Sequence, residues 1–202
     1  MQAIIGIAVF LAVLVYPATN RLADPYGGET LYLPFGSLVS DWRKILNKLA
    51  SDDVLLGACV DSNTLECAPA RQLWAIIQDT KTQHDLATIG QLNRSVNLAI
   101  KWVPRPWQGV LEAINADDDC KAYATTKYFA LIEAGFAPNR IRLVIVHQNG
   151  FLEDHMVVAV WADRWLILDN RTMVMAPDNQ TRYTPLYVLD LHGLRGYSVP
   201  VS

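Results

Sequence analysis

The chain has 202 residues, of which 51% are hydrophobic and 18% are charged, and it contains no low-complexity run. This composition excludes a disordered chain, and the length fits one domain of ordinary size with a proper core rather than two full domains. The formal net charge is -3 and the basic residues are scattered. Nucleic acid is therefore excluded as a partner, because a phosphate backbone requires a concentrated basic surface.

The N-terminus carries an apolar run from Ala3 to Tyr16, which Pro17 ends. At roughly fourteen residues the run matches the hydrophobic part of a signal peptide better than the ~20 residues of a spanning helix. No Lys or Arg precedes it and no small-x-small cleavage site follows, so an uncleaved anchor and a buried N-terminal helix or strand both stay open. We expect residues 1–23 to be a signal peptide or an N-terminal membrane anchor and residues 24–202 to form the folded domain.

Two of the three cysteines, Cys59 and Cys67, lie eight positions apart around the turn formers at 61–63. In an exported protein they are expected to form a disulfide, which leaves Cys120 as the odd thiol. The alternative is two free thiols in a reduced cytosol. A zinc site is not expected, because four ligands cannot be assembled from nearby His or Cys residues.

Helices are predicted where apolar residues recur every three or four positions, over residues 41–49, 72–79, 89–100 and 120–134. Ser40 or Asp41 is expected to cap the first helix, and Gly135 to end the last. Pro104 and Pro106 prevent the third helix from continuing, because proline lacks an amide donor and fixes φ. The helix over residues 120–134 is predicted to be the central one.

Strands are predicted after residue 140, over residues 140–147, 155–161, 165–169, 173–176 and 186–190. Helices followed by a run of neighbouring strands indicate an α+β domain with an antiparallel sheet. There is no alternation of strand and helix and no glycine-rich phosphate loop, so nucleotide binding is not expected.

A candidate nucleophile, Cys120, stands at the start of the central helix, directly after Asp117, Asp118 and Asp119. A helix N-terminus carries unsatisfied N–H groups and a partial positive charge, which stabilise a thiolate over a thiol. The backbone N–H of Cys120 could also donate to a developing oxyanion. The alternative is a cysteine that only packs, since free cysteines are among the most buried residues.

A base and its orienting partner are predicted in the following hairpin, where His155 opens one strand and Asp169 closes the next. If residue 160 pairs with residue 164, the same register sets His155 opposite Asp169, on one face of the sheet. One imidazole nitrogen would then be held by the carboxylate and the other left for the thiol. The alternatives are a structural sheet histidine and a turn aspartate, and a slip of one residue would separate the pair.

The motifs around these residues resemble the bacterial transglutaminase-like cysteine peptidases. They are Asp-Cys-x-x-Tyr-Ala-x-x-Lys-Tyr at 119–128, Leu-Ile-x-x-Gly at 131–135, Arg-Leu-Val-x-Val at 142–146, Asp-His-Met-Val at 154–157 and Leu-Asp-Asn at 168–170. Val96-Asn97 and the Cys59 and Cys67 pair resemble the upstream part of the family. The resemblance implies a papain-like fold and a Cys120, His155 and Asp169 triad.

The chain departs from the family around the nucleophile. The family usually has Gly-Asp-Cys-Glu-Asp-Tyr, whereas residues 118–123 read Asp-Asp-Cys-Lys-Ala-Tyr. In family members that release adhesins, acidic residues near the cysteine are associated with calcium, and Lys121 and Ala122 replace two of them. We therefore expect no cofactor, with Asp117, Asp118 and Asp119 as weak calcium candidates, and an activity that survives chelation.

Two functions follow from these observations. The first is an exported cysteine peptidase of the periplasm or cell envelope, acting through an acyl-enzyme on a protein substrate such as a cell-surface or envelope protein. The second is a non-catalytic or acyl-transferring version of the same fold, serving as a binding module of the bacterial envelope.

Overall fold

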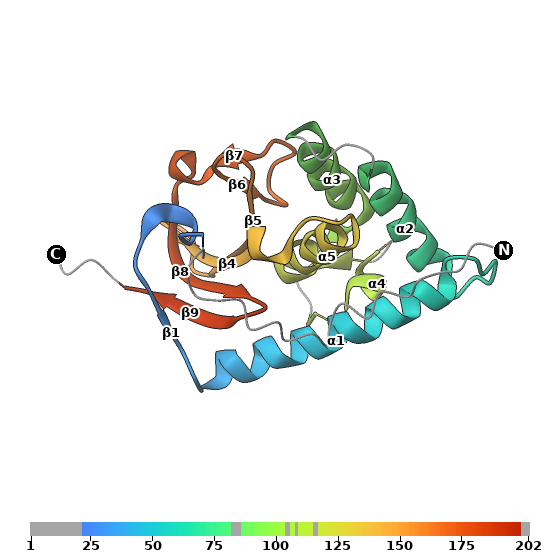
Figure 1. The fold of residues 1–202 in the computed structure, drawn as a ribbon, viewed down its shortest axis with the longest axis horizontal. Helices are drawn as coiled ribbons and strands as arrows, with labels where there is room; N and C mark the ends of the chain where they lie inside the picture. The colour runs from blue at the N-terminus through green and yellow to red at the C-terminus, as the bar shows by residue number, and fades with distance from the viewer. Residues whose placement is uncertain (1–21, 82–85, 104–105, 108, 115–116, 199–202) are drawn as a thin grey trace.

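The computed structural model describes residues 22–81, 86–103, 106–107, 109–114 and 117–198 (Figure 1). All but the last two residues of the predicted signal peptide or anchor therefore lie outside the described residues. Within the described ranges, no helix combines the length and the apolar character needed to cross a membrane.

The helices are α1 (Ser37–Cys59), α2 (Ala68–Lys81), α3 (Leu86–Ala99), α4 (Val110–Ala113) and α5 (Cys120–Glu133). The four predicted helices are found at their places, but α1 is much longer than the predicted segment 41–49. Its C-terminal half breaks the apolar pattern with Asp52, which is nevertheless buried. The carboxylate of Asp52 accepts hydrogen bonds from Lys48 Nζ at 2.7 Å and from the backbone N–H of Val110 at 2.9 Å.

The main sheet has the order β1-β9-β8-β4-β5-β6-β7, and all its neighbours are antiparallel. Its strands are β1 (Thr30–Tyr32), β4 (Ile141–Gln148), β5 (His155–Trp161), β6 (Trp165–Leu168), β7 (Ala176–Pro177), β8 (Tyr183–Asp190) and β9 (Gly193–Tyr197). A separate parallel pair joins β2 (Lys101–Trp102) to β3 (Asp117–Asp118). The predicted α+β class with an antiparallel sheet is confirmed.

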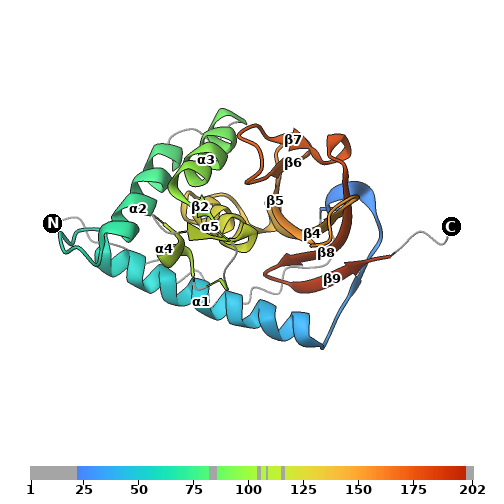
Figure 2. The same cartoon turned by 180° about the vertical axis from the view of Figure 1, so that it is seen from behind.

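Helix α5 lies at the centre of the molecule, between the sheet and the other helices (Figures 1 and 2). It packs on β4 and β5 and contacts α2, α3 and α4. Every residue from Ala122 to Leu131 is buried, including polar ones. A helix covered on all sides needs no single apolar face, which explains why its polar and apolar residues are mixed.

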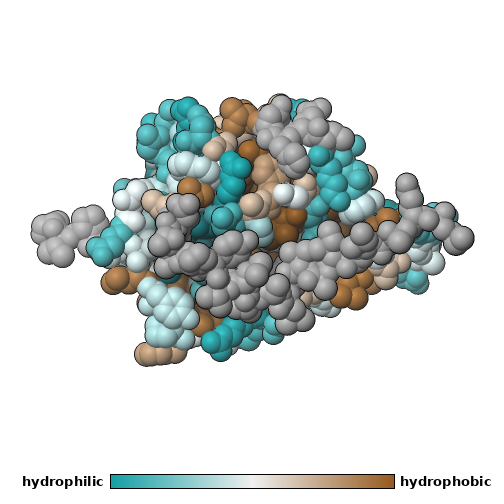
Figure 3. All heavy atoms as spheres, viewed as in Figure 1, coloured by the Kyte–Doolittle hydropathy of each residue, from teal (hydrophilic) through white to brown (hydrophobic). Residues whose placement is uncertain are grey.

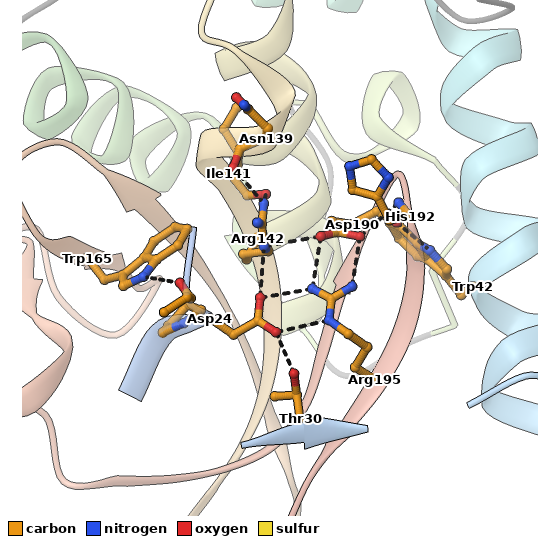
Figure 4. A network of polar contacts seen from close by, with 12 residues as sticks. Asp24, Thr30, Trp42, Asn139, Ile141, Arg142, Trp165, Asp190, His192 and Arg195 are labelled. Carbon is orange, nitrogen blue, oxygen red and sulfur yellow. Dashed lines mark hydrogen bonds and ion pairs between the residues drawn. The ribbon is translucent and has the colours of Figure 1, made fainter. Parts of the chain in front are cut away.

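On the other face of the sheet, Leu22 and Tyr26 of the segment that precedes α1 pack against the buried strand residues. Asp24 lies there in a buried network with Arg142, Arg195 and Asp190 (Figure 4). The guanidinium of Arg195 bridges the two carboxylates, with Nε 2.9 Å from Asp24 Oδ2 and Nη2 2.9 Å from Asp190 Oδ2. Arg142 Nε lies 3.2 Å from Asp24 and 3.1 Å from Asp190. The network ties the start of the domain to β4, β8 and β9.

Replacing Asp24 with alanine is expected to lower the free energy of unfolding by about 3–5 kcal/mol, because it leaves buried guanidinium charge without its partner. Asp163→Ala is the matched control, since Asp163 pairs with Arg164 on the exposed surface and such pairs contribute about 0–1 kcal/mol. Urea unfolding of both variants gives the comparison. Equal losses in the two variants would show that the buried network does not stabilise the fold.

The two cysteines predicted to pair do so. Cys59 is the last residue of α1, Cys67 directly precedes α2, and the structure joins them in a disulfide. Arg71 of α2 donates from Nη1 to the carbonyl oxygens of Ser62 and Thr64, and so holds the loop between the cysteines. Among the described residues, Cys120 is the free cysteine.

Candidate active site

Cys120 is the first residue of α5 and is partly exposed, whereas the helix behind it is buried. The residue before it, Asp119, caps the helix: its Oδ1 accepts the backbone N–H of Lys121 at 2.9 Å. Strand β3 leads into this cap and is fixed by its pairing with β2. The local sequence therefore holds a thiol at the N-terminal end of a rigid helix, where the helix dipole favours negative charge.

The hairpin of β5 and β6 places the predicted base and its partner, but in a register different from the predicted one. Val160 pairs with Leu166, not with residue 164, and a three-residue connection joins the strands. The register is thus displaced by two residues. Because side chains alternate faces with a period of two, such a displacement keeps His155 and Asp169 on the same face as diagonal neighbours.

The side chains of Cys120, His155 and Asp169 are brought together at this end of the sheet. His155 Nε2 lies 2.8 Å from Asp169 Oδ1, and Cys120 lies close enough to the imidazole to raise its pKa. With Nε2 engaged by the carboxylate, Nδ1 is the nitrogen left for the sulfur. His155 is 2% exposed and Asp169 5%, so water screens their interaction little.

The electrostatics of the pair favour a charged imidazole. Burial lowers the pKa of His155, but the hydrogen bonds with Asp169 and Cys120 outweigh it and leave the pKa above its ordinary value. Burial likewise raises the pKa of Asp169, yet the hydrogen bond and charge of His155, with smaller contributions from Arg171 and Tyr183, bring it down to about 2. The carboxylate is therefore ionised at neutral pH and stabilises an imidazolium beside the thiol.

Three further residues hold Asp169 in place. The backbone N–H of Arg171 donates to Oδ1 at 3.0 Å, the hydroxyl of Tyr183 donates to Oδ2, and Asn97 Nδ2 donates to the backbone oxygen of Asp169 at 2.9 Å. Tyr183 is not among the site residues predicted from the sequence. Tyr183 lies on β8, and β4 and β5 stand between β8 and the strand that leads to Asp169. The sequence has no local signal for a contact over that distance.

A buried lysine, Lys127, lies two turns after Cys120 on the same side of α5. Burial lowers the pKa of its amine to about 7, and the charge of Asp169 opposes that shift. The sequence pattern places Lys127 in the helical core and gives no sign of its electrostatic interaction with the site. Near neutral pH this amine stands between its charged and its neutral form.

Exposed apolar side chains flank the site. Trp102 pairs through its backbone with Asp118, two residues before Cys120, and is 57% exposed. Phe151 and Leu152 are also exposed and lie in the connection that ends at His155. The guanidinium of Arg171 stacks 5.0 Å from the centre of the Phe151 ring. Apolar and polar residues also lie side by side on the face of the molecule shown in Figure 3.

The acidic run before Cys120, which consists of β3 and the cap residue Asp119, is the calcium candidate predicted from the sequence. The side chains of Asp117 and Asp118 lie outside the described part of the structure. Asp119 Oδ2 lies 3.2 Å from the ammonium of Lys121. Within the described ranges, no group of three or more His, Cys, Asp and Glu residues could hold a metal ion. Carboxylate oxygens are nevertheless the donors that calcium prefers, so this acidic run has suitable chemistry.

Comparison with known proteins gives a family and a fold. The model of a family described as bacterial transglutaminase-like cysteine proteinase matches residues 57–189. No curated protein matches the chain. Three solved structures of Legionella pneumophila LapG are similar to it, each at 16% sequence identity.

The calcium-bound LapG structure has a TM-score of 0.58, with 77% of this chain and 93% of LapG covered. A further LapG structure gives 0.60, with 72% and 87% covered, and the EGTA-treated one gives 0.61, with 75% and 87% covered. These likenesses show the fold. The calcium-bound and EGTA-treated forms of LapG also point to calcium involvement, which corrects the sequence-based expectation of no cofactor.

Proposed function

Because the chain belongs to the bacterial transglutaminase-like cysteine proteinase family and is thus a cysteine peptidase, we propose that Cys120, His155 and Asp169 form its catalytic triad. The observation that carries this proposal is the continuous chain of contacts from the Cys120 thiol through His155 to Asp169. Nucleophile, base and orienting group are the three parts that acyl transfer by a thiol requires. This complete set favours hydrolysis over a purely binding role.

The reaction then runs through an acyl-enzyme. The Cys120 thiolate attacks the peptide carbonyl carbon, and the oxyanion that forms accepts a hydrogen bond from the Cys120 backbone N–H. The imidazolium of His155 gives its proton to the leaving amine, and the carbon–nitrogen bond breaks. His155 next takes a proton from water, whose oxygen attacks the thioester. The sulfur leaves as a thiolate, and release of the carboxylic acid product restores the thiolate and imidazolium of the starting state.

The substrate is proposed to be a protein of the cell surface or envelope. The exposed apolar residues Trp102, Phe151 and Leu152 flank the triad and suit an extended segment with apolar side chains. The disulfide between Cys59 and Cys67 supports an oxidising compartment. Residues 1–23 are proposed as the signal peptide or membrane anchor that brings residues 24–202 there.

The proposed triad is tested by alkylation with iodoacetate, an anionic reagent that an imidazolium attracts. The rate of Cys120 carboxymethylation is expected to follow a bell-shaped pH profile, because the reaction needs both a thiolate and a charged His155. The mass of the modified peptide identifies the cysteine, and Cys120→Ser is the control for other sites. A rate that only rises towards high pH, as for an ordinary thiol, would contradict the triad.

Calcium is part of the proposal because the similar LapG structures include a calcium-bound form. Asp117, Asp118 and Asp119 would supply carboxylate oxygens, and the ion would neutralise the acidic approach to Cys120. Treatment with EGTA is expected to lower activity, and calcium to restore it. Lys121→Ala should tighten calcium binding by removing the ammonium beside Asp119. The control is Lys44→Ala, because Lys44 forms an exposed ion pair with Asp41, far from Cys120 in the sequence. If calorimetry finds the same calcium affinity in both variants, Asp117, Asp118 and Asp119 are ruled out as the calcium site.

A further inference from the structure

We propose that Tyr183 is a positioning residue for this reaction: its hydroxyl fixes the Asp169 carboxylate in the orientation that holds His155. The inference rests on the proposed function. Tyr183 opens β8 and donates its hydroxyl hydrogen to Asp169 Oδ2, while His155 and the backbone N–H of Arg171 occupy Oδ1. Each oxygen of the Asp169 carboxylate thus has its own partners, and these partners together fix the orientation of the carboxylate plane.

The hydroxyl is a donor throughout the working pH range. Burial, followed by the hydrogen bond to Asp169 and its negative charge, raises the pKa of Tyr183 well above the ordinary value. The phenol therefore stays protonated when Asp169 is ionised. Its ring also lies against the imidazole, with ring centres 5.9 Å apart. Tyr183 thus contacts both members of the pair that it is proposed to align.

Removal of the hydroxyl has a specific consequence. Asp169 is buried, so Oδ2 would be left without its donor, at a cost that favours rotation of the carboxylate towards another partner. Rotation would weaken the contact between Oδ1 and His155 Nε2. The imidazolium would lose support, and its pKa would fall. The Cys120 sulfur would then lose the charged partner that stabilises its anionic form, and its reaction would slow.

The experiment is the iodoacetate profile of Cys120 in Tyr183→Phe. A positioning role predicts that the basic limb of the profile, which reports the loss of the charge on His155, moves to lower pH and that the maximal rate falls about tenfold. Tyr187→Phe is the matched control: it changes a half-buried tyrosine of the same strand, for whose hydroxyl the described residues show no hydrogen bond. Its profile should equal that of the wild type.

Other outcomes overturn the inference. If the pH profile of Tyr183→Phe equals that of the wild type, the Tyr183 side chain contributes packing and does not position Asp169. If the basic limb of the Tyr183→Phe profile moves to higher pH, the Tyr183 hydroxyl only withdraws negative charge from Asp169 and does not align it. If the wild-type protein itself shows no bell, the triad has failed, and that result is distinct from a failure of Tyr183 alone.

Thermal unfolding checks that the variant is folded. Should Tyr183→Phe not fold, the wild-type protein still decides the question by nuclear magnetic resonance. A hydroxyl bound to a carboxylate gives a slowly exchanging proton resonance connected to the Tyr183 ring, and its absence would overturn the proposal.

Discussion

Replacing Cys120 with alanine is expected to abolish hydrolysis, with a fall in rate of roughly 10⁴-fold or more, because in the proposed mechanism the acyl-enzyme forms on its sulfur. The substitution removes only a sulfur at the partly exposed start of α5, so the fold and the Cys59–Cys67 disulfide should be retained. Activity is measured by mass spectrometry as new peptide termini in an extract of envelope proteins, a readout that works for any protein substrate in the extract.

His155→Ala provides the companion test. Residues that act as one unit lose their contributions together, so the double variant Cys120→Ala/His155→Ala should be about as inactive as either single one. His147→Ala is the control, since His147 pairs with Asp154 on the surface near the same strands. Retention of cleavage in Cys120→Ala would assign the reaction to another nucleophile.

Asp169→Asn is expected to lower the rate by roughly 10²–10⁴-fold, since the amide can hold the wrong tautomer of the imidazole. The sign of the pH effect follows from the charges. The Asp169 carboxylate raises the pKa of His155, so its loss lowers that pKa, and the imidazolium disappears at lower pH than in the wild type. The basic limb of the iodoacetate profile should therefore move to lower pH.

The matched control for this variant is Asp163→Asn, at the turn of the same hairpin, where the carboxylate is exposed. It should leave both the rate and the pH profile unchanged. Unchanged limbs in Asp169→Asn would show that Asp169 does not support the charge of His155.

How much the sequence can predict differs between local and long-range features. The start of α5 and the bounds of β5 follow from periodicity and agree with the structure. The predicted pairing of β5 with β6 is two residues out of register, because the strands are joined by residues 162–164, one position later than the assumed turn over residues 161–163. The placement of His155 and Asp169 on one face survives only because the displacement is even.

Two further differences, the missing β9 and the short first helix, share a physical cause, which is the burial of a charged side chain through a distant partner. Strand β9 is not predicted because Arg195 interrupts its apolar pattern, yet this guanidinium is buried between Asp24 and Asp190 (Figure 4). The second half of α1 is not predicted for the same reason: Asp52 interrupts its apolar pattern, yet this carboxylate is buried and accepts a hydrogen bond from the backbone N–H of Val110. The contacts of Arg195 with Asp24 and of Asp52 with Val110 have no local sequence signal, since each joins residues far apart along the chain.

Acylation of Cys120 with help from His155 is tested most directly with p-nitrophenyl acetate, a small ester that can stand in for the natural substrate. The proposed triad predicts a burst of nitrophenolate, one acetyl group mapped to Cys120 by mass spectrometry, and its later loss as water completes the turnover. In His155→Ala both acetylation and its loss should be slow. Acetylation at other residues only, or equally fast acetylation of Cys120 without His155, would contradict the proposed mechanism.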